Sequence, residues 1–170
     1  PHSAIKALQA LPLIESGAAD AFGLSDAELA IACASHSGEQ WHIDTVRQWL
    51  ARIGISEGAL SCGPHWPSHH QATLHEIVHT NKTSGDINNN CSGKHAGMLT
   101  TAHPLGEALN GYNQQTHPVQ QRILGTLETM CGLDLSGAPR STDGCSVPAW
   151  AIPLSNLAYA FARLGAPDDL

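Results

Sequence analysis

Residues 89–99 read NNCSGKHAGML, and within them a polar loop turns into an apolar segment. Residues 96–102 are mostly small or apolar, and they predict a short buried helix. Just before it stand the thiol of Cys91, the hydroxyl of Ser92, the amine of Lys94 and the imidazole of His95. The first turn of a helix presents free backbone N–H groups that favour anions. The stretch therefore predicts a buried helix with reactive groups at its start.

A second thiol stands at Cys145, in the segment Asp143-Gly144-Cys145, which also supplies a carboxylate. Zinc sites are usually built from ligand pairs close together in sequence, whereas Cys91 and Cys145 are far apart. Free cysteines are also often buried for structural reasons alone. Their spacing in the sequence is compatible with two roles for these thiols, as metal ligands or as buried core residues.

Near the start of the chain, Ser3-Ala4-Ile5-Lys6 forms an S-x-x-K pattern. Side chains at i and i+3 meet on a helix. An amine shielded from water then takes the serine proton, as in penicillin-binding proteins and class A β-lactamases. The alternative is a serine that caps a helix, followed by a solvated lysine, because serine is a favoured N-cap residue.

The remaining pattern predicts a helix-rich chain with few strands. Apolar residues recur at helical spacing over residues 5–14, with Pro12 as a kink or stop and Gly17 where the helix ends. Ser25-Asp26-Ala27-Glu28 has the form of a capping box at the start of a helix. Further helical segments are predicted over residues 29–34, 44–53, 118–130 and 154–164.

Composition limits the class of protein. The chain has 170 residues, enough for one domain with its own core. Its net charge is −7, so it cannot supply the basic face that nucleic acids or anionic membranes require. No window approaches the roughly 18 apolar residues of a bilayer span. The number of cysteines is odd, 5, and none forms a C-x-x-C pair, which favours a reducing cytoplasm over a disulfide framework.

The segment His75-Glu76-Ile77-Val78-His79 matches H-E-x-x-H. In that motif, His75 and His79 on one helix face bind zinc and Glu76 acts as general base, so a zinc metalloprotease is an alternative function. The longer metzincin pattern fails because Lys82 stands where glycine is required, and 11 histidines in the chain make a chance match easier.

Five motifs, in the same order, together resemble the rhizobial-type (type II) L-asparaginases. They are SAIK (3–6), ASHSGE (34–39), CGPHWP (62–67), NNCSGKHAGML (89–99) and DGCSVP (143–148). The resemblance implies hydrolysis of L-asparagine to L-aspartate and ammonia. It also implies an α/β fold of the α+β type, similar to serine β-lactamases, penicillin-binding proteins and serine-dependent glutaminases, here incomplete and helix-rich.

The family is considerably longer, so residues 1–170 are expected to form one partial asparaginase domain, truncated at both ends. The resemblance assigns Ser3 and Lys6 to one Ser–Lys tandem. It assigns Ser35, chosen over Ser37 in the same motif, to a second tandem whose lysine lies further downstream. A homodimer is expected for the full-length protein.

For metal binding, the resemblance assigns Cys91, Lys94 and Cys145 as zinc ligands. Lys94 is an unusual ligand, because its amine must be neutral to donate a lone pair. His95 and Asp143 are assigned to binding and orienting the substrate. Zinc is expected to aid substrate binding and to be dispensable for the chemical step. A non-catalytic zinc-binding fragment is the remaining alternative.

Overall fold

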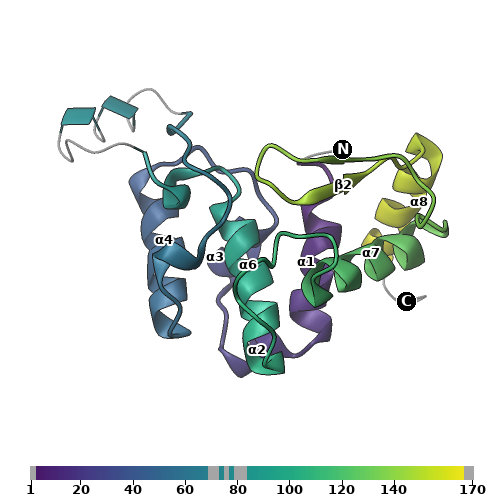
Figure 1. Ribbon diagram of the computed structural model, residues 1–170, viewed down its shortest axis with the longest axis horizontal. Helices are drawn as coiled ribbons and strands as arrows, with labels where there is room; N and C mark the ends of the chain where they lie inside the picture. The colour runs from purple at the N-terminus through teal and green to yellow at the C-terminus, as the bar shows by residue number, and fades with distance from the viewer. Residues whose placement is uncertain (1–2, 69–72, 75–76, 79–83, 167–170) are drawn as a thin grey trace.

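The computed structural model describes residues 3–68, 73–74, 77–78 and 84–166 (Figure 1). Helices dominate these residues, with one small antiparallel sheet, an architecture compatible with the expected α+β class. No helix among the described residues is long and apolar enough to cross a membrane. In chain order, the elements are α1 (Lys6–Glu15), α2 (Ala18–Ala21), α3 (Asp26–Ala32), α4 (Gln40–Arg52), η1 (Glu57–Ala59), η2 (Asp86–Asn88), α6 (Ser92–Ala102), η3 (His103–Leu105), α7 (Pro118–Cys131), β1 (Arg140–Thr142), β2 (Pro148–Trp150) and α8 (Leu154–Gly165).

Helix α6 lies at the centre of the packing, between α3 and α4 on one side and α1 on the other, and it also contacts α7 (Figure 1). All of its residues are buried. A Cβ on Gly93 would lie 2.4 Å from the carbonyl oxygen of Ile31, and a Cβ on Gly97 would contact Leu13 at 3.5 Å. Gly93 therefore allows the backbones of α3 and α6 to approach to contact.

The predicted buried helix is confirmed, and it begins earlier than expected, at Ser92. The preceding loop explains this difference. The side-chain oxygen of Asn89 accepts a hydrogen bond from the backbone N–H of Cys91 at 2.8 Å, and its carbonyl accepts one from Ser92 N–H at 2.9 Å. These bonds turn the chain into the helix, so Lys94 and His95 lie in its first turn.

Two predicted helix starts have different outcomes. The Ser25 hydroxyl accepts a hydrogen bond from Glu28 N–H while the Glu28 carboxylate accepts one from Ser25 N–H, so the predicted capping box of α3 is confirmed. Helix α1 begins at Lys6 and has no side-chain cap, so Ser3 does not act as its N-cap. The hydroxyl of Ser3 is thus available for other contacts.

Helix α1 continues past Pro12, where the sequence predicts a kink or stop. Pro12 cannot donate a backbone hydrogen bond, but its carbonyl accepts one from Ser16 N–H at 3.0 Å. The neighbouring Leu8 and Leu13 are buried in the core. Burial of the apolar stripe therefore outweighs the missing bond. The helix ends before Gly17, whose φ is 73°.

Strands β1 and β2 form an antiparallel hairpin. In the turn between them, Asp143 N–H donates to the carbonyl of Val147 at 2.8 Å, and Ser146 N–H donates to the carbonyl of Asp143 at 2.8 Å. Ser146 adopts a left-handed φ of 71°. Figure 1 shows the hairpin across the end of α1. The turn therefore carries Asp143 and Cys145 on one side of the helical core.

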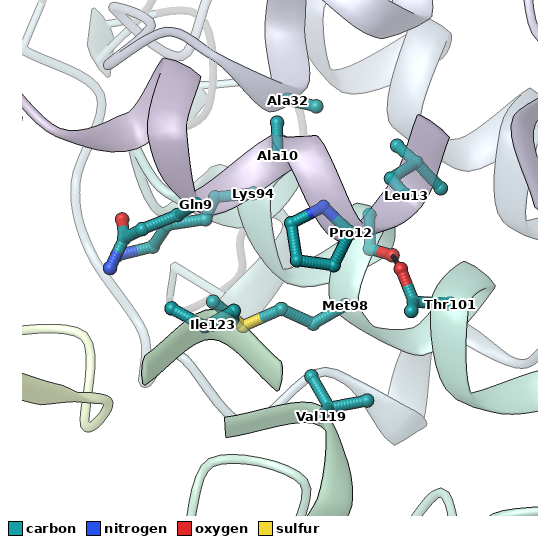
Figure 2. Close-up of a pocket in the computed structure, with 11 residues that line it drawn as sticks. Gln9, Ala10, Pro12, Leu13, Ala32, Lys94, Met98, Thr101, Val119 and Ile123 are labelled. Carbon is teal, nitrogen blue, oxygen red and sulfur yellow. Dashed lines mark hydrogen bonds between the residues drawn. The ribbon is translucent and has the colours of Figure 1, made fainter. Parts of the chain in front are cut away.

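A cavity of about 10 Å³ lies between α1, α6 and α7 (Figure 2). Its lining includes Gln9 and Pro12 of α1, Lys94 and Met98 of α6, and Ile123 of α7. This volume is close to the least that a single water needs and far below the roughly 300 Å³ of small-molecule sites. The interior around α6 is closely packed, so a substrate site has to lie elsewhere.

Replacing Gly93 by alanine places a methyl group 2.4 Å from the Ile31 carbonyl oxygen, where only backbone movement relieves the clash. We expect Gly93→Ala to lower the free energy of unfolding by about 1–3 kcal/mol, measured by urea denaturation with circular dichroism. Gly125→Ala in α7 is the control, because a Cβ there meets nothing within 4 Å; it should raise the same free energy by about 0.5–1 kcal/mol. Equal effects of the two substitutions would contradict the close approach of α3 and α6.

Candidate active site

Ser3, Ser35 and Lys6 form one hydrogen-bonded network. The hydroxyl oxygens of Ser3 and Ser35 are 2.7 Å apart, and Nζ of Lys6 lies 2.8 Å from Ser35 Oγ. The Lys6 amine also donates to the carbonyl oxygens of Ala34 at 2.7 Å and Asn90 at 3.3 Å. Three segments that are distant in sequence therefore meet at one amine.

Lys6 is the first residue of α1, and no part of it is exposed. Burial is the largest influence on its amine and lowers the pKa. The neighbouring Cys91 raises the pKa and Lys94 lowers it, and the balance leaves it below its usual value. A neutral amine is therefore within reach at lower pH than for a solvated lysine. The alternative interpretation of the S-x-x-K pattern, in which Ser3 caps the helix and Lys6 is exposed to solvent, is therefore wrong.

Within the described residues, the lysine that contacts Ser35 is Lys6, and the downstream lysine expected for the second tandem stays a prediction. Ser3 precedes the start of α1, so the i, i+3 helical geometry expected for Ser3 and Lys6 does not apply. Ser3 instead reaches the network through Ser35. The hydroxyl of Ser37 donates to Glu39 at 2.8 Å, which agrees with the choice of Ser35 over Ser37.

His36 attaches the Ser35 segment to the start of α6. Its backbone N–H donates to the carbonyl of Asn90 at 3.2 Å, and its Nε2 lies 2.8 Å from the hydroxyl of Ser92. Its Nδ1 accepts a hydrogen bond from Gly38 N–H at 3.2 Å, so the ring proton sits on Nε2. Burial, followed by the charges of His42 and Lys6, lowers the pKa of His36 to about 4, so the ring is neutral at pH 7.

The two predicted thiols lie in one cluster, although they are far apart in sequence. Nζ of Lys94 donates to Cys145 Sγ at 3.0 Å and lies 3.5 Å from Oδ2 of Asp143. Cys145 Sγ is 3.7 Å from the same carboxylate oxygen. Cys91 and Cys145 also hydrogen-bond to each other. The hairpin turn and the start of α6 thus bring two thiols, an amine and a carboxylate together.

The two thiols hold their protons unequally. The hydrogen bond from Cys145 lowers the pKa of Cys91 most, burial raises it, and the charges of Lys94 and Lys6 lower it further, to about 6. The same hydrogen bond and burial raise the pKa of Cys145. Of the two sulfurs, Cys91 is therefore the one that favours the thiolate form at neutral pH. Since Cys91 also hydrogen-bonds Lys6, it connects the thiol cluster to the two serines.

His95 is buried on the other side of Cys145. Its Nδ1 lies 2.5 Å from the hydroxyl oxygen of Tyr112. Burial, the largest influence, lowers the pKa of His95, so the ring is neutral at pH 7. The nearby imidazole of His95 lowers the pKa of Cys145 and partly offsets the effect of burial on that thiol.

The structure connects every site residue that the sequence predicts. The serines reach Lys6, Lys6 reaches Cys91, and Cys91 reaches the cluster on the hairpin turn. The connected residues are Ser3, Lys6, Ser35, Cys91, Lys94, His95, Asp143 and Cys145. The alternative metal motif, His75, Glu76 and His79, lies outside the described residues.

The donor set of the thiol cluster fits a zinc ion. Thiolate sulfur and amine nitrogen are both ligands that zinc accepts, and Cys91 favours the thiolate form at neutral pH. Within the described part of the chain, no group of three or more His, Cys, Asp and Glu side chains has the arrangement of a metal site. The predicted set differs from such a group because its third ligand is the amine of Lys94.

A groove of about 400 Å³ opens beside Ser35, between α3 and the start of α4. Ala30 and Ile31 form part of its apolar lining, and Trp41 and His42, whose ring centroids are 3.6 Å apart, line its aromatic side. The volume lies within the range of roughly 300–1,000 Å³ found for small-molecule sites. The groove gives a small molecule access to the serine network.

Four contributors to the network were missed by sequence reasoning. The carbonyls of Ala34 and Asn90 belong to the backbone, so no residue type marks them. Tyr112 stands in an irregular polar segment without periodicity, and nothing in its neighbours marks it as a partner of His95. His36 lies inside the ASHSGE motif, between Ser35 and Ser37, and that position is the one signal that points to it.

Comparison with known families agrees with this arrangement of residues. The family model described as L-asparaginase II matches residues 1–170. A search of curated proteins returns no match. The matched range contains both the serine network and the thiol cluster, so the resemblance found on separate motifs extends along the whole chain. The chain belongs to the L-asparaginase II family and is therefore an asparaginase, an amidohydrolase that acts on L-asparagine.

Proposed function

We propose that the enzyme hydrolyses L-asparagine through an acyl-enzyme on Ser3, with Ser35 passing the serine proton to Lys6. The observation that carries the proposal is the order of hydrogen bonds from Ser3 to Ser35 and from Ser35 to the buried amine of Lys6. Ser35 Oγ is engaged on both sides, by Ser3 and by Lys6. Ser3 is the outer member of this series, which favours it as the group that attacks the substrate.

The two carbonyls at Lys6 support a basic role for its amine. A neutral amine has two N–H groups and one lone pair. Carbonyl oxygens only accept hydrogen bonds, so the two N–H groups donate to Ala34 and Asn90. In the charged state the third N–H of Lys6 is taken by the Cys91 thiolate; when the amine is neutral, that position becomes a lone pair, which we propose turns to the hydroxyl of Ser35 at 2.8 Å. In this state the Ser35 proton points to Lys6 and the Ser3 proton points to Ser35, which is the direction that proton removal requires.

The reaction then runs in two halves. Ser3 Oγ attacks the side-chain amide carbon of asparagine, and its proton moves by way of Ser35 to Lys6. When the carbon–nitrogen bond breaks, the leaving nitrogen takes a proton from Lys6 by the same route and departs as ammonia. Water then attacks the ester on Ser3, losing a proton to Lys6, and aspartate is released as Ser3 regains its proton. Atoms and charges balance, and Lys6 ends as it began.

Zinc is proposed as a resident metal, held by Cys91, Lys94 and Cys145. When bound, the metal would offer an open coordination position for an oxygen of the substrate, which fits a binding role. Lys94 has to lose its proton to serve as a ligand. Its Nζ lies 3.0 Å from Cys145 Sγ and 3.5 Å from Asp143 Oδ2, within the cluster that would hold the metal. Asp143 and His95 are proposed to bind and orient the substrate beside this cluster.

The remaining parts of the proposal concern fold and surroundings. A relation to the serine β-lactamase, penicillin-binding protein and glutaminase fold is supported by the position of Ser3 and Lys6 at the head of the buried helix α1. A cytoplasmic location is supported by five cysteines that are free thiols. A single partial domain and a homodimer of the full-length protein are proposed on the family resemblance, and light scattering tests the dimer.

Ser3→Ala removes the attacking oxygen, and we expect kcat for asparagine to fall by more than about a thousandfold. Ammonia release measures the activity. Ser37→Ala is the matched control, since Ser37 bonds to Glu39 and should retain near-normal activity. Acid quenching of the parent enzyme during turnover, followed by peptide mass spectrometry, should find the aspartyl ester on Ser3. An ester on Ser35 instead would overturn the assignment of the nucleophile.

Lys6 acts only as a neutral amine, so kcat/KM should fall as the pH drops through its lowered pKa. Below that pKa the amine is protonated and cannot accept the serine proton. Above it the amine is neutral and can act as the base. Activity is therefore lost on the acid side of the profile. Lys6→Met should lower kcat by about 100-fold or more, whereas Arg47→Met, in a surface ion pair on α4, should leave the profile unchanged. Full activity of Lys6→Met would exclude it as the base.

Cys145→Ser tests whether the thiol cluster serves binding or chemistry. Because zinc is proposed to hold the substrate, we expect KM for asparagine to rise about tenfold or more, with kcat changed much less. Cys33→Ser is the matched control, since that thiol is exposed at the end of α3. A collapse of kcat with KM unchanged would show that the cluster takes part in the chemical step.

A further inference from the structure

The segment between α3 and α4, residues 34–39, carries Ser35 and forms neither helix nor strand. Regular backbone hydrogen bonds therefore do not fix Ser35 Oγ, which lies 2.7 Å from Ser3 Oγ and 2.8 Å from Lys6 Nζ. Those two partners exchange protons with Ser35 in the proposed reaction, so their bonds to it change during turnover. A group outside the reaction has to keep Ser35 in place, and the next residue, His36, has the contacts to do so.

The imidazole ring of His36 is buried and has three different neighbours. Its Nδ1 accepts a hydrogen bond from the backbone N–H of Gly38 at 3.2 Å, within the same segment. Its Nε2 lies 2.8 Å from the hydroxyl oxygen of Ser92. The face of the ring stacks on His42 in the first turn of α4, with centroids 5.0 Å apart. The ring therefore joins the segment that carries the serine to two helices, α4 and α6.

Ser92 is a fixed point for this contact. It is the first residue of α6, a helix whose residues are all buried, and Ser92 itself is fully buried. Its backbone N–H donates to the carbonyl of Asn89 at 2.9 Å. Because Nδ1 of His36 already accepts a hydrogen bond, its Nε2 is the donor and the Ser92 oxygen accepts. The ring is thus bonded to a well-packed part of the interior.

The backbone of His36 has a second attachment to the same region. Its N–H donates to the carbonyl of Asn90 at 3.2 Å, and that carbonyl also accepts from Lys6 Nζ at 3.3 Å. One bond at the backbone and one at the end of the ring together fix both the position and the direction of residue 36. The adjacent Ser35 follows that placement. A displacement of about 1 Å at a reacting group costs up to about 100-fold in rate.

We propose that His36 is a positioning residue, whose ring, bonded to Ser92, keeps Ser35 Oγ in place between its two partners in the serine network. His36 itself contacts neither of those partners through its ring and takes no proton in the reaction. The inference rests on the proposed function, in which Ser35 passes the serine proton to Lys6. It assigns His36 an effect on kcat, because the alignment of Ser35 matters for the chemical step and not for holding the substrate.

The chain offers a closely matched control in His117, which precedes α7. Its Nδ1 accepts from the backbone N–H two residues on, that of Val119, at 3.2 Å. Its Nε2 lies 2.8 Å from the carbonyl oxygen of Ala108. These two contacts have the same distances as those of His36, but they lie outside the serine network. Any difference in activity between matched variants at the two positions therefore reports the location of the histidine.

Asparagine at either position removes the contact made by Nε2 and keeps an acceptor for the N–H two residues on, as asparagine does in turns. We expect His36→Asn to lower kcat for asparagine by about 10- to 100-fold, with KM changed much less, and His117→Asn to keep kcat near the parental value. Ammonia release measures both constants, and circular dichroism confirms folding. Parental kcat in folded His36→Asn, or equal losses in the two variants, would overturn the proposal.

His36→Gln tests rescue, because the amide nitrogen of glutamine extends about as far as Nε2 of histidine and carries N–H groups that Ser92 can accept from. We expect its kcat to lie between that of the parent and that of His36→Asn. A kcat below that of His36→Asn would show that the contact with Gly38, and not the contact with Ser92, is the one that matters, and would overturn the proposal.

A double-mutant cycle with Ser92→Ala tests the bond itself. If the two side chains act through one contact, the double variant His36→Asn/Ser92→Ala should lose about as much kcat as the more severe single variant. Losses that multiply would show independent effects and overturn the proposal. Where Ser92→Ala does not fold, the comparison of asparagine and glutamine at position 36 decides the question.

Failure of this inference and failure of the proposed function give different results. If Ser3→Ala is inactive while His36→Asn retains the parental kcat, the nucleophile stands and the positioning role of His36 fails. If Ser3→Ala retains activity while His36→Asn and Ser92→Ala show one shared loss of kcat, the assignment of the nucleophile fails and the positioning of Ser35 by His36 is supported.

Discussion

The amine of Lys6 is buried in the protein interior, and most of the site consists of groups that contact this amine. Burial of an unpaired charge is costly, so such a group requires partners or the loss of its proton. The carbonyls of Ala34 and Asn90 take two of its N–H groups, the Ser35 hydroxyl lies 2.8 Å from its nitrogen, and the Cys91 thiolate takes the third N–H and supplies opposite charge. Ala34 and Ser35 belong to one loop and Asn90 and Cys91 to another, so the position of one amine fixes the relative placement of α1 and these two loops.

Helix α6 makes this placement possible. Its backbone touches that of α3 at Gly93, so Cys91 and Lys94 reach the loop that follows α3 and the head of α1. A larger side chain at position 93 would separate the serine network from the thiol cluster. Because the helices pack closely here, the cavity between α1, α6 and α7 is too small for a substrate. The larger space is the surface groove beside Ser35.

Local patterns predicted the helices well, because caps and apolar stripes act over a few residues. The capping box at Ser25 and the buried segment after Lys94 are examples. The partners of Lys6 could not be predicted, because they depend on where α1 begins and on backbone carbonyls that no side chain marks. Membership of the candidate site came from resemblance of motifs. Only tertiary packing shows that Ser35 contacts both Ser3 and Lys6.

The hairpin turn that carries Cys145 is distant in sequence from the amine it contacts, because Lys94 and Cys145 are 51 positions apart. During synthesis, the head of α1 and the start of α6 therefore leave the ribosome well before the turn that completes their cluster. Contacts of such separation form late, since closing a long loop precedes any gain from the contact. Until the turn is made, the nascent chain therefore holds Ser3, Lys6, Ser35, Cys91 and Lys94 without Cys145, and the assembled cluster marks a late stage of folding.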